Sequence, residues 1–65
     1  MNTEFNRYWK WFTEKQIRLM FKETLTAKDL NTLKHMRKER EQLVDYINYR
    51  GFYVDENDNI HRSKL

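Results

Sequence analysis

The side chains in this sequence that could carry out catalysis are few and poorly spaced for it. Ser63 stands two residues after His61, a spacing too local to predict a catalytic triad. Asp29 and Asp45 have no evident catalytic partner. Cysteine is absent and glycine occurs once, which excludes a thiol nucleophile and a glycine-rich phosphate loop. The sequence therefore predicts a protein that is not an enzyme.

Candidate metal ligands are equally sparse. Asp55, Asn57 and Asn59 alternate as calcium ligands do, but Ile60 occupies the position that needs glycine. Side-chain-to-backbone turns explain these residues better. With two histidines and no cysteine, we expect neither a metal ion nor another cofactor.

The segment RYWKWF, residues 7–12, could recognise a partner through its aromatic rings. Intervals of three and four residues predict a helical stripe of the kind that fills a core. That stripe consists of Phe5, Tyr8, Trp9 and Phe12. Trp11 lies at its edge, and Trp, Tyr and Arg are enriched at protein interfaces. We expect partner contacts from Arg7, Tyr8, Lys10 and Trp11, while stacking on nucleic-acid bases is the alternative use of such rings.

A second charged segment, KHMRKEREQ at residues 34–42, has one apolar side chain. Its charges fit either a solvated helix surface with local ion pairs or a second binding surface. The binding surface would consist of Lys34, Arg37, Lys38 and Glu41 and would face an acidic protein or phosphates. The neighbouring glutamates would weaken contact with phosphate.

A long helix is predicted over residues 27–50. Thr26 and Asp29 have capping-box spacing at its start, and Gly51 follows as a C-terminal stop. Its apolar positions follow a heptad that is interrupted by Arg40. A buried Arg40 needs a carboxylate, which we expect from a second subunit or from one of three glutamates, Glu4, Glu14 or Glu23.

An earlier helical segment is predicted over about residues 4–24. Thr13 and Gln16 repeat the capping-box spacing, which indicates either a break near Thr13 or one continuous helix. The apolar stripes before and after Thr13 are offset around an ideal helix, and a bend would let both face one core. We therefore favour a break.

The segment from Gly51 onward, residues 51–65, changes character. Phe52, Tyr53 and Val54 favour a strand, and the polar cluster 55–59 favours a turn, so we expect a short β-hairpin-like tail. An isolated hairpin is marginal in water, and this one must rest on a helix.

The predicted architecture is all-α, with residues 1–65 forming a single small domain. An antiparallel helical hairpin or a three-helix unit carries the tail, with a two-residue connection at 25–26. A core this thin leads us to expect a homodimer. Side chains assigned to the core or to the dimer contact are Phe5, Trp9, Phe12, Leu33, Met36, Leu43 and Ile47.

Charge and hydropathy narrow the class of protein. The net charge of +3 and the pI of 9.3 are mildly basic, which permits nucleic-acid binding without requiring it. No apolar run approaches the length of a membrane span, and cysteine is absent, so we expect a cytoplasmic location without membrane contact.

The composition resembles that of small accessory proteins of bacteriophages with AT-rich genomes and of small regulators of their Firmicute hosts. The shared features are short length, absence of Cys and Pro, and abundant Lys, Asn, Tyr, Phe and Ile. Many such proteins bind and block a larger host protein. We expect a protein-binding regulator or inhibitor, with a nucleic-acid-binding regulator and a structural assembly component as alternatives.

Overall fold

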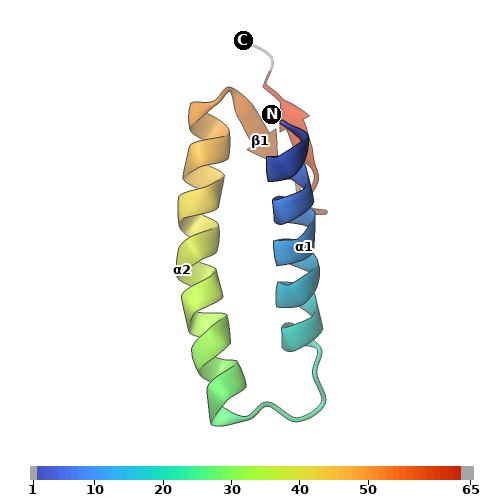
Figure 1. The fold of residues 1–65 in the computed structure, drawn as a ribbon, viewed down its shortest axis with the longest axis vertical. Coiled ribbons are helices and arrows are strands. Elements are labelled where there is room, and N and C mark those ends of the chain that lie inside the picture. Colours follow the sequence, from blue (N-terminus) through green and yellow to red (C-terminus); the bar gives the residue numbers. More distant parts are fainter. Residues whose placement is uncertain (1, 64–65) are drawn as a thin grey trace.

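Two helices and a short hairpin make up the computed structural model, which describes residues 2–63. The elements are α1 (Thr3–Met20), α2 (Ala27–Tyr49), β1 (Phe52–Val54) and β2 (Ile60–Arg62). The helices run antiparallel, and the hairpin lies beside the end of the pair where α1 begins and α2 ends (Figure 1). A mostly helical chain with a β-hairpin near its C-terminus is confirmed.

Helix α1 is continuous, so the predicted break near Thr13 and the three-helix unit are wrong. Asn2 caps the start of the helix, since its side chain accepts a hydrogen bond from the Phe5 amide at 2.8 Å. Thr13 is buried, and its hydroxyl donates to the Lys10 carbonyl at 3.0 Å. A threonine whose hydroxyl bonds within its own helix does not cap a new one. Helix α1 ends at Met20, so the connection is longer than the predicted two residues.

Helix α2 follows the predicted bounds closely because local signals set both its ends. The Asp29 amide donates to the Thr26 hydroxyl at 3.1 Å, and the Asp29 carboxylate accepts from the Thr26 amide at 3.1 Å. This reciprocal pair is the predicted capping box. Gly51 follows the helix with φ of +87°, a conformation that glycine adopts without a Cβ clash.

The core forms a thin seam between the two helices and the hairpin. Its buried apolar side chains are Trp9, Phe12, Leu33, Met36 and Ile47. Phe5 and Leu43 are half-buried, and the Phe5 ring lies 5.3 Å from that of Tyr46. One chain thus buries most of the side chains that the sequence assigned to a core or a dimer contact.

The hairpin pairs its strands antiparallel, with Tyr53 opposite His61. Asp55 organises the turn, since its Oδ1 accepts from the Asn57 amide at 2.8 Å and the Asn59 amide at 2.9 Å. This is the predicted side-chain-to-backbone turn. It places Asp58 in the left-handed region, with φ of +65°.

Asp58 joins the hairpin to both helices. Its carbonyl accepts a hydrogen bond from the Trp9 indole Nε1 at 2.7 Å, and its carboxylate forms an ion pair with Arg40. The Arg40 guanidinium also lies 5.1 Å from the centre of the Trp9 ring. The expectation that a helix glutamate or a second subunit would neutralise Arg40 is wrong, because the carboxylate comes from the hairpin turn.

We predict that Asp58→Ala lowers the free energy of unfolding by about 2–3 kcal/mol, from the lost ion pair and from forcing alanine into the left-handed region. Asp58→Gly keeps the backbone freedom and loses only the carboxylate, so its cost is about 1–2 kcal/mol. Urea unfolding followed by tryptophan fluorescence measures both. Glu56→Ala, in the same turn and exposed, is the matched control; an equal loss in Glu56→Ala and Asp58→Ala would refute the role of Asp58.

Acid weakens this fold through two aspartates. The ion pair with Lys22 and the Thr26 amide hold the pKa of Asp29 below its ordinary 3.8. The Asn59 amide, with His61 as a further donor, does the same for Asp55. A lowered pKa in the folded state stabilises the protein above the unfolded pKa, and this stabilisation is lost as pH falls through the folded value.

The free energy of unfolding should therefore be constant above about pH 5, and it should decrease as the pH is lowered below about 4. Chemical unfolding measured across this range tests it. Asp29→Asn and Asp55→Asn should each reduce the loss of unfolding free energy at low pH, whereas Asp45→Asn should leave this loss as in the wild type. A wild-type loss at low pH in both Asp29→Asn and Asp55→Asn would show that these two aspartates are not its cause.

Candidate partner-binding surface

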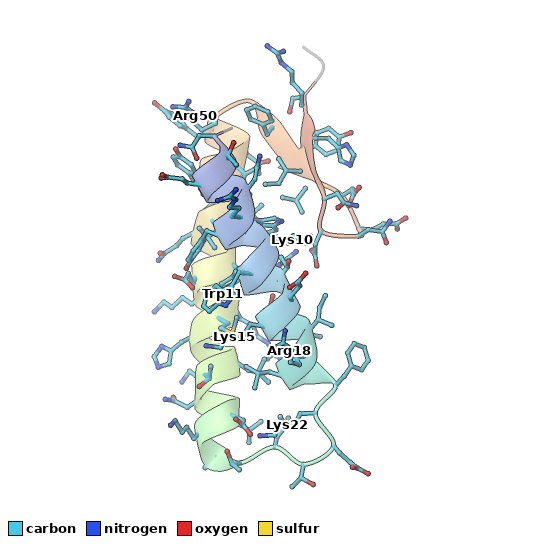
Figure 2. All side chains as sticks on the ribbon, turned by 45° about the vertical axis from the view of Figure 1, so that its right-hand side comes forward. Lys10, Trp11, Lys15, Arg18, Lys22 and Arg50 are labelled. Atoms are coloured by element: carbon cyan, nitrogen blue, oxygen red, sulfur yellow. The ribbon has the colours of Figure 1, made fainter. Side chains whose placement is uncertain are left out.

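Helix α1 and the connection that follows it present a row of aromatic and cationic side chains on the side away from the hairpin. Trp11, Lys15, Arg18 and Lys22 recur at intervals of four, three and four residues and follow one another down one side of the molecule (Figure 2). All four are exposed. Together with Tyr8 they form what we call the Trp11 surface.

Trp11 is the centre of this surface. Its side chain is 53% exposed, whereas Trp9, two residues earlier, is 3% exposed. The Lys15 ammonium lies 5.2 Å from the centre of the Trp11 ring, and the Tyr8 ring lies 5.8 Å away at an angle of 42°. One tryptophan therefore belongs to the core, while the other is a half-exposed ring held by two neighbours.

Tyr8 anchors the Trp11 surface to α2. Its hydroxyl donates to Glu39 Oε1 at 3.0 Å, and its ring stacks 6.2 Å from the buried ring of Phe12. Burial raises the pKa of the Tyr8 phenol, and the hydrogen bond to Glu39 raises it further. The phenol therefore stays protonated near neutral pH and acts as the donor in this bond.

The side chains assigned to partner binding lie on different parts of the molecule. Arg7 precedes Trp11 by four residues and is exposed on the same side of α1. Lys10 is exposed but lines the groove beside the hairpin, so the structure separates it from the Trp11 surface. The proposed second surface on α2 is exposed throughout, at Lys34, Arg37, Lys38 and Glu41.

Sequence reasoning missed three members of the Trp11 surface, namely Lys15, Arg18 and Lys22. The signal was present in their spacing, which repeats the helical period from Trp11. Lys22 also contacts the first turn of α2, where its ammonium lies 2.6 Å from the Asp29 carboxylate. Its charge is therefore partly neutralised, and Lys15 and Arg18 contribute most of the positive charge beside Trp11.

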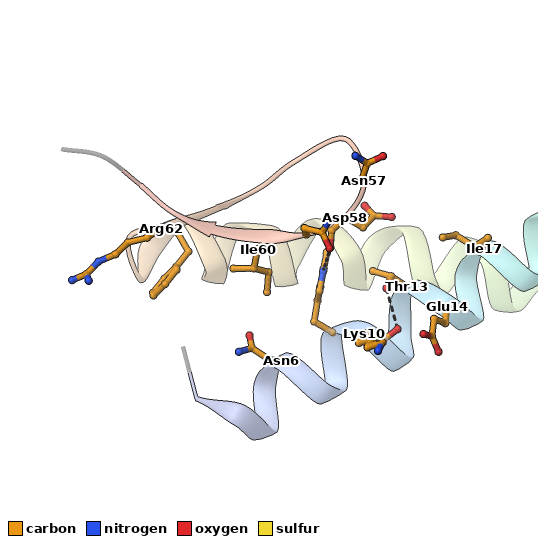
Figure 3. Close-up of a pocket in the computed structure, with 12 residues that line it drawn as sticks. Asn6, Lys10, Thr13, Glu14, Ile17, Asn57, Asp58, Ile60 and Arg62 are labelled. Carbon is orange, nitrogen blue, oxygen red and sulfur yellow. Dashed lines mark hydrogen bonds between the residues drawn. The ribbon is translucent and has the colours of Figure 1, made fainter.

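A groove of about 540 Å³ separates α1 from the hairpin (Figure 3). Lys10 and Glu14 line it from α1, and Asn57 and Arg62 line it from the hairpin. Amides and charges of both signs could bind an extended polar segment. The sequence could not reveal this groove because the hairpin's position creates it.

Metal-binding clusters and membrane-spanning helices are both absent from residues 2–63. No cluster of three or more His, Cys, Asp or Glu side chains is arranged to hold a metal ion there. No helix in this range combines the length and apolar character that crossing a membrane requires.

Comparison with known proteins gives no family assignment. No family model, curated protein or solved structure matches the chain. The surfaces of the molecule are therefore the evidence for its function.

Iodide quenching of tryptophan fluorescence tests the geometry of the Trp11 surface. Iodide should quench the wild type more strongly than caesium does, because Lys15 attracts the anion to the exposed ring. Lys15→Ala should lower the iodide quenching constant roughly two-fold at low salt. In Trp11→Phe, which leaves the buried Trp9 alone, quenching should nearly disappear. Strong iodide quenching that persists in Trp11→Phe would show that Trp11 is not the exposed ring.

Proposed function

We propose that this chain is a non-enzymatic, cytoplasmic regulator that binds a larger protein through the Trp11 surface. The observation that carries the proposal is the half-exposed ring of Trp11, packed between Lys15 and Tyr8. Exposing a large aromatic ring to water is unfavourable, and rings of this kind surrounded by polar groups often anchor protein interfaces.

The surroundings of Trp11 favour a protein partner over nucleic acid. Base stacking needs a free ring face, and the Lys15 ammonium lies over one face of Trp11. Binding along a phosphate backbone also needs a concentration of positive charge. Here Lys22 is paired with Asp29, so Lys15 and Arg18 contribute most of the positive charge beside Trp11.

The same contacts define the chemistry of the partner. An apolar pocket would take the exposed edge of Trp11, and a rim of Asp and Glu side chains would pair with Lys15 and Arg18. Tyr8 is already fixed by Glu39, so binding would order few additional side chains. A short chain with a pre-ordered surface is suited to covering a site on a larger protein. Inhibition of that protein fits the compositional resemblance to phage accessory proteins.

Photo-crosslinking from position 11 identifies the partner. A photoreactive amino acid replaces Trp11, and an identical replacement at Tyr49, an aromatic residue that is 85% exposed at the far end of α2, serves as the matched control. A protein captured from position 11 but not from position 49 is then purified for binding measurements.

With that purified protein, Trp11→Ala should weaken binding by roughly 30-fold or more, as expected for an interface anchor. Tyr49→Ala should stay within about two-fold of the wild type. Circular dichroism checks that both variants are folded. Wild-type affinity in a folded Trp11→Ala variant would overturn the proposal.

Duplex and single-stranded DNA provide the counter-test. We expect no tight binding in fluorescence anisotropy at about 50 mM salt, where phosphate contacts are strongest. Sub-micromolar binding that collapses at about 200 mM salt would replace the protein-binding proposal with the nucleic-acid alternative.

A further inference from the structure

The outer edge of strand β2 offers backbone hydrogen-bonding groups that β1 does not use. In an antiparallel pair, residues that bond across the ladder alternate with residues whose N–H and C=O groups point outward. The Ser63 amide bonds to the Gly51 carbonyl at 3.0 Å, and the register makes His61 the next bonded residue of β2. The N–H and C=O groups of Ile60 and Arg62 therefore point away from β1. Such a free strand edge is a template for pairing with another chain.

This edge borders the groove between α1 and the hairpin. Ile60 and Arg62 line the groove from the hairpin, and Asn6 and Lys10 line it from α1 (Figure 3). The other strand, β1, packs against α2. A strand added beside β2 therefore lies alongside α1, across the mouth of the groove. The groove volume of about 540 Å³ falls within the roughly 300–1,000 Å³ that is usual for ligand-binding pockets.

Alternate side chains of a strand added at this edge enter the groove. Residues directly opposite each other in a sheet place their side chains on the same face. Ile60 is half-buried on the face toward the helices, whereas His61 is exposed on the other face. The two residues opposite Ile60 and Arg62 therefore point toward α1, and the residue between them points to solvent. Backbone bonds supply the affinity of such a contact, and the alternate side chains supply its specificity.

The charges of the groove identify the side chains that it accepts. Arg62 lies at the strand edge, Lys10 lies on α1, and Glu14 lies one helical turn beyond Lys10, away from Arg62 (Figure 3). Asp58 also lines the groove, but Arg40 neutralises its carboxylate. No ion pair within residues 2–63 involves Lys10, Glu14 or Arg62, so two cations and one carboxylate remain. The groove is therefore positive overall and complements acidic side chains.

We propose that the groove binds an extended acidic segment of another protein, which adds to the free edge of β2 as a third, antiparallel strand. Acidic side chains of that segment enter the groove and pair with Lys10 and Arg62. A two-stranded hairpin is marginal in water, and a third strand stabilises it. The site gives a binding role to Lys10, which lies apart from the Trp11 surface. The proposal does not rest on the proposed function, because it involves neither Trp11 nor the partner bound there.

Nuclear magnetic resonance titration of the isotope-labelled chain with a synthetic strand tests the proposal. The probe is a capped threonine peptide of about seven residues with glutamate at two alternate central positions, and the control peptide has lysine at both. At about 2 mM, the glutamate peptide should shift the Ile60 and Arg62 amide signals and slow their hydrogen exchange about 10-fold or more. The Phe52 and Val54 amides point to the opposite edge and should keep their exchange rates. The lysine peptide should bind at least about five-fold more weakly.

Reversing the charge of Lys10 tests the contact across the groove. Lys10→Glu should weaken binding of the glutamate peptide at least about 10-fold and strengthen binding of the lysine peptide. Lys38→Glu makes the same change at an exposed site on α2 outside the groove lining, and it should alter either affinity by no more than about two-fold. Circular dichroism confirms that both variants are folded. Equal losses of affinity in the two variants would refute the role of Lys10.

Three further results would overturn the proposal. The first is a glutamate peptide that leaves the Ile60 and Arg62 amides unchanged at about 2 mM, a concentration that detects even millimolar affinity. The second is equal binding of the glutamate and lysine peptides. The third is a shift of these two amides that grows with protein concentration in the absence of peptide, which would show that a second copy of the chain occupies the edge.

Discussion

The contact of Asp58 with Trp9 and Arg40 is the interaction on which the rest of this structure depends. Two helices of this length share only a narrow apolar seam, and a two-stranded hairpin is not stable by itself. Asp58 resolves both difficulties at one point, because its carbonyl binds the indole of α1 and its carboxylate binds the guanidinium of α2. Both helices and the hairpin therefore stabilise one another through one turn residue.

The same contact determines which surfaces remain exposed. It fixes the hairpin over one end of one side of the helix pair, which buries Trp9 and leaves Met20, Phe21 and Leu30 exposed at the other end. Within residues 2–63 no element covers the opposite side of α1, so Trp11 remains half-exposed beside Lys15. The exposure of the Trp11 ring follows from a core too small to bury all the large side chains of the chain.

Local sequence signals predicted the parts of the fold that depend on local interactions. The capping box at Thr26 and the glycine after α2 each act within a few residues, and both were correct. Thr13 misled the prediction because a threonine hydroxyl satisfies either a helix start or its own helix, and only tertiary burial decides between them. The partner of Arg40 lies 18 residues away in a tail of two short strands, and no local pattern specifies that pairing.

The sequence likewise predicts only those parts of the candidate surfaces that depend on local helical spacing. Helical periodicity placed Trp11 at the edge of the aromatic stripe, and extending that period along the helix would have found Lys15 and Arg18 as well. The separation of Lys10 from Trp11 could not be predicted, because it depends on where the hairpin lies.

Native-state hydrogen exchange tests most directly whether the Asp58 contact holds the molecule together. Exchange of the hairpin amides, such as that of Ser63 bonded to the Gly51 carbonyl, is compared with exchange of α1 amides near Trp9 across a low urea series. Our account predicts that both sets exchange through the same cooperative unfolding, with matching free energies and urea dependence. If the hairpin amides exchange at a much lower free energy while the α1 amides stay protected, the helix pair is stable without the hairpin. That result would contradict the central role of the Asp58 contact.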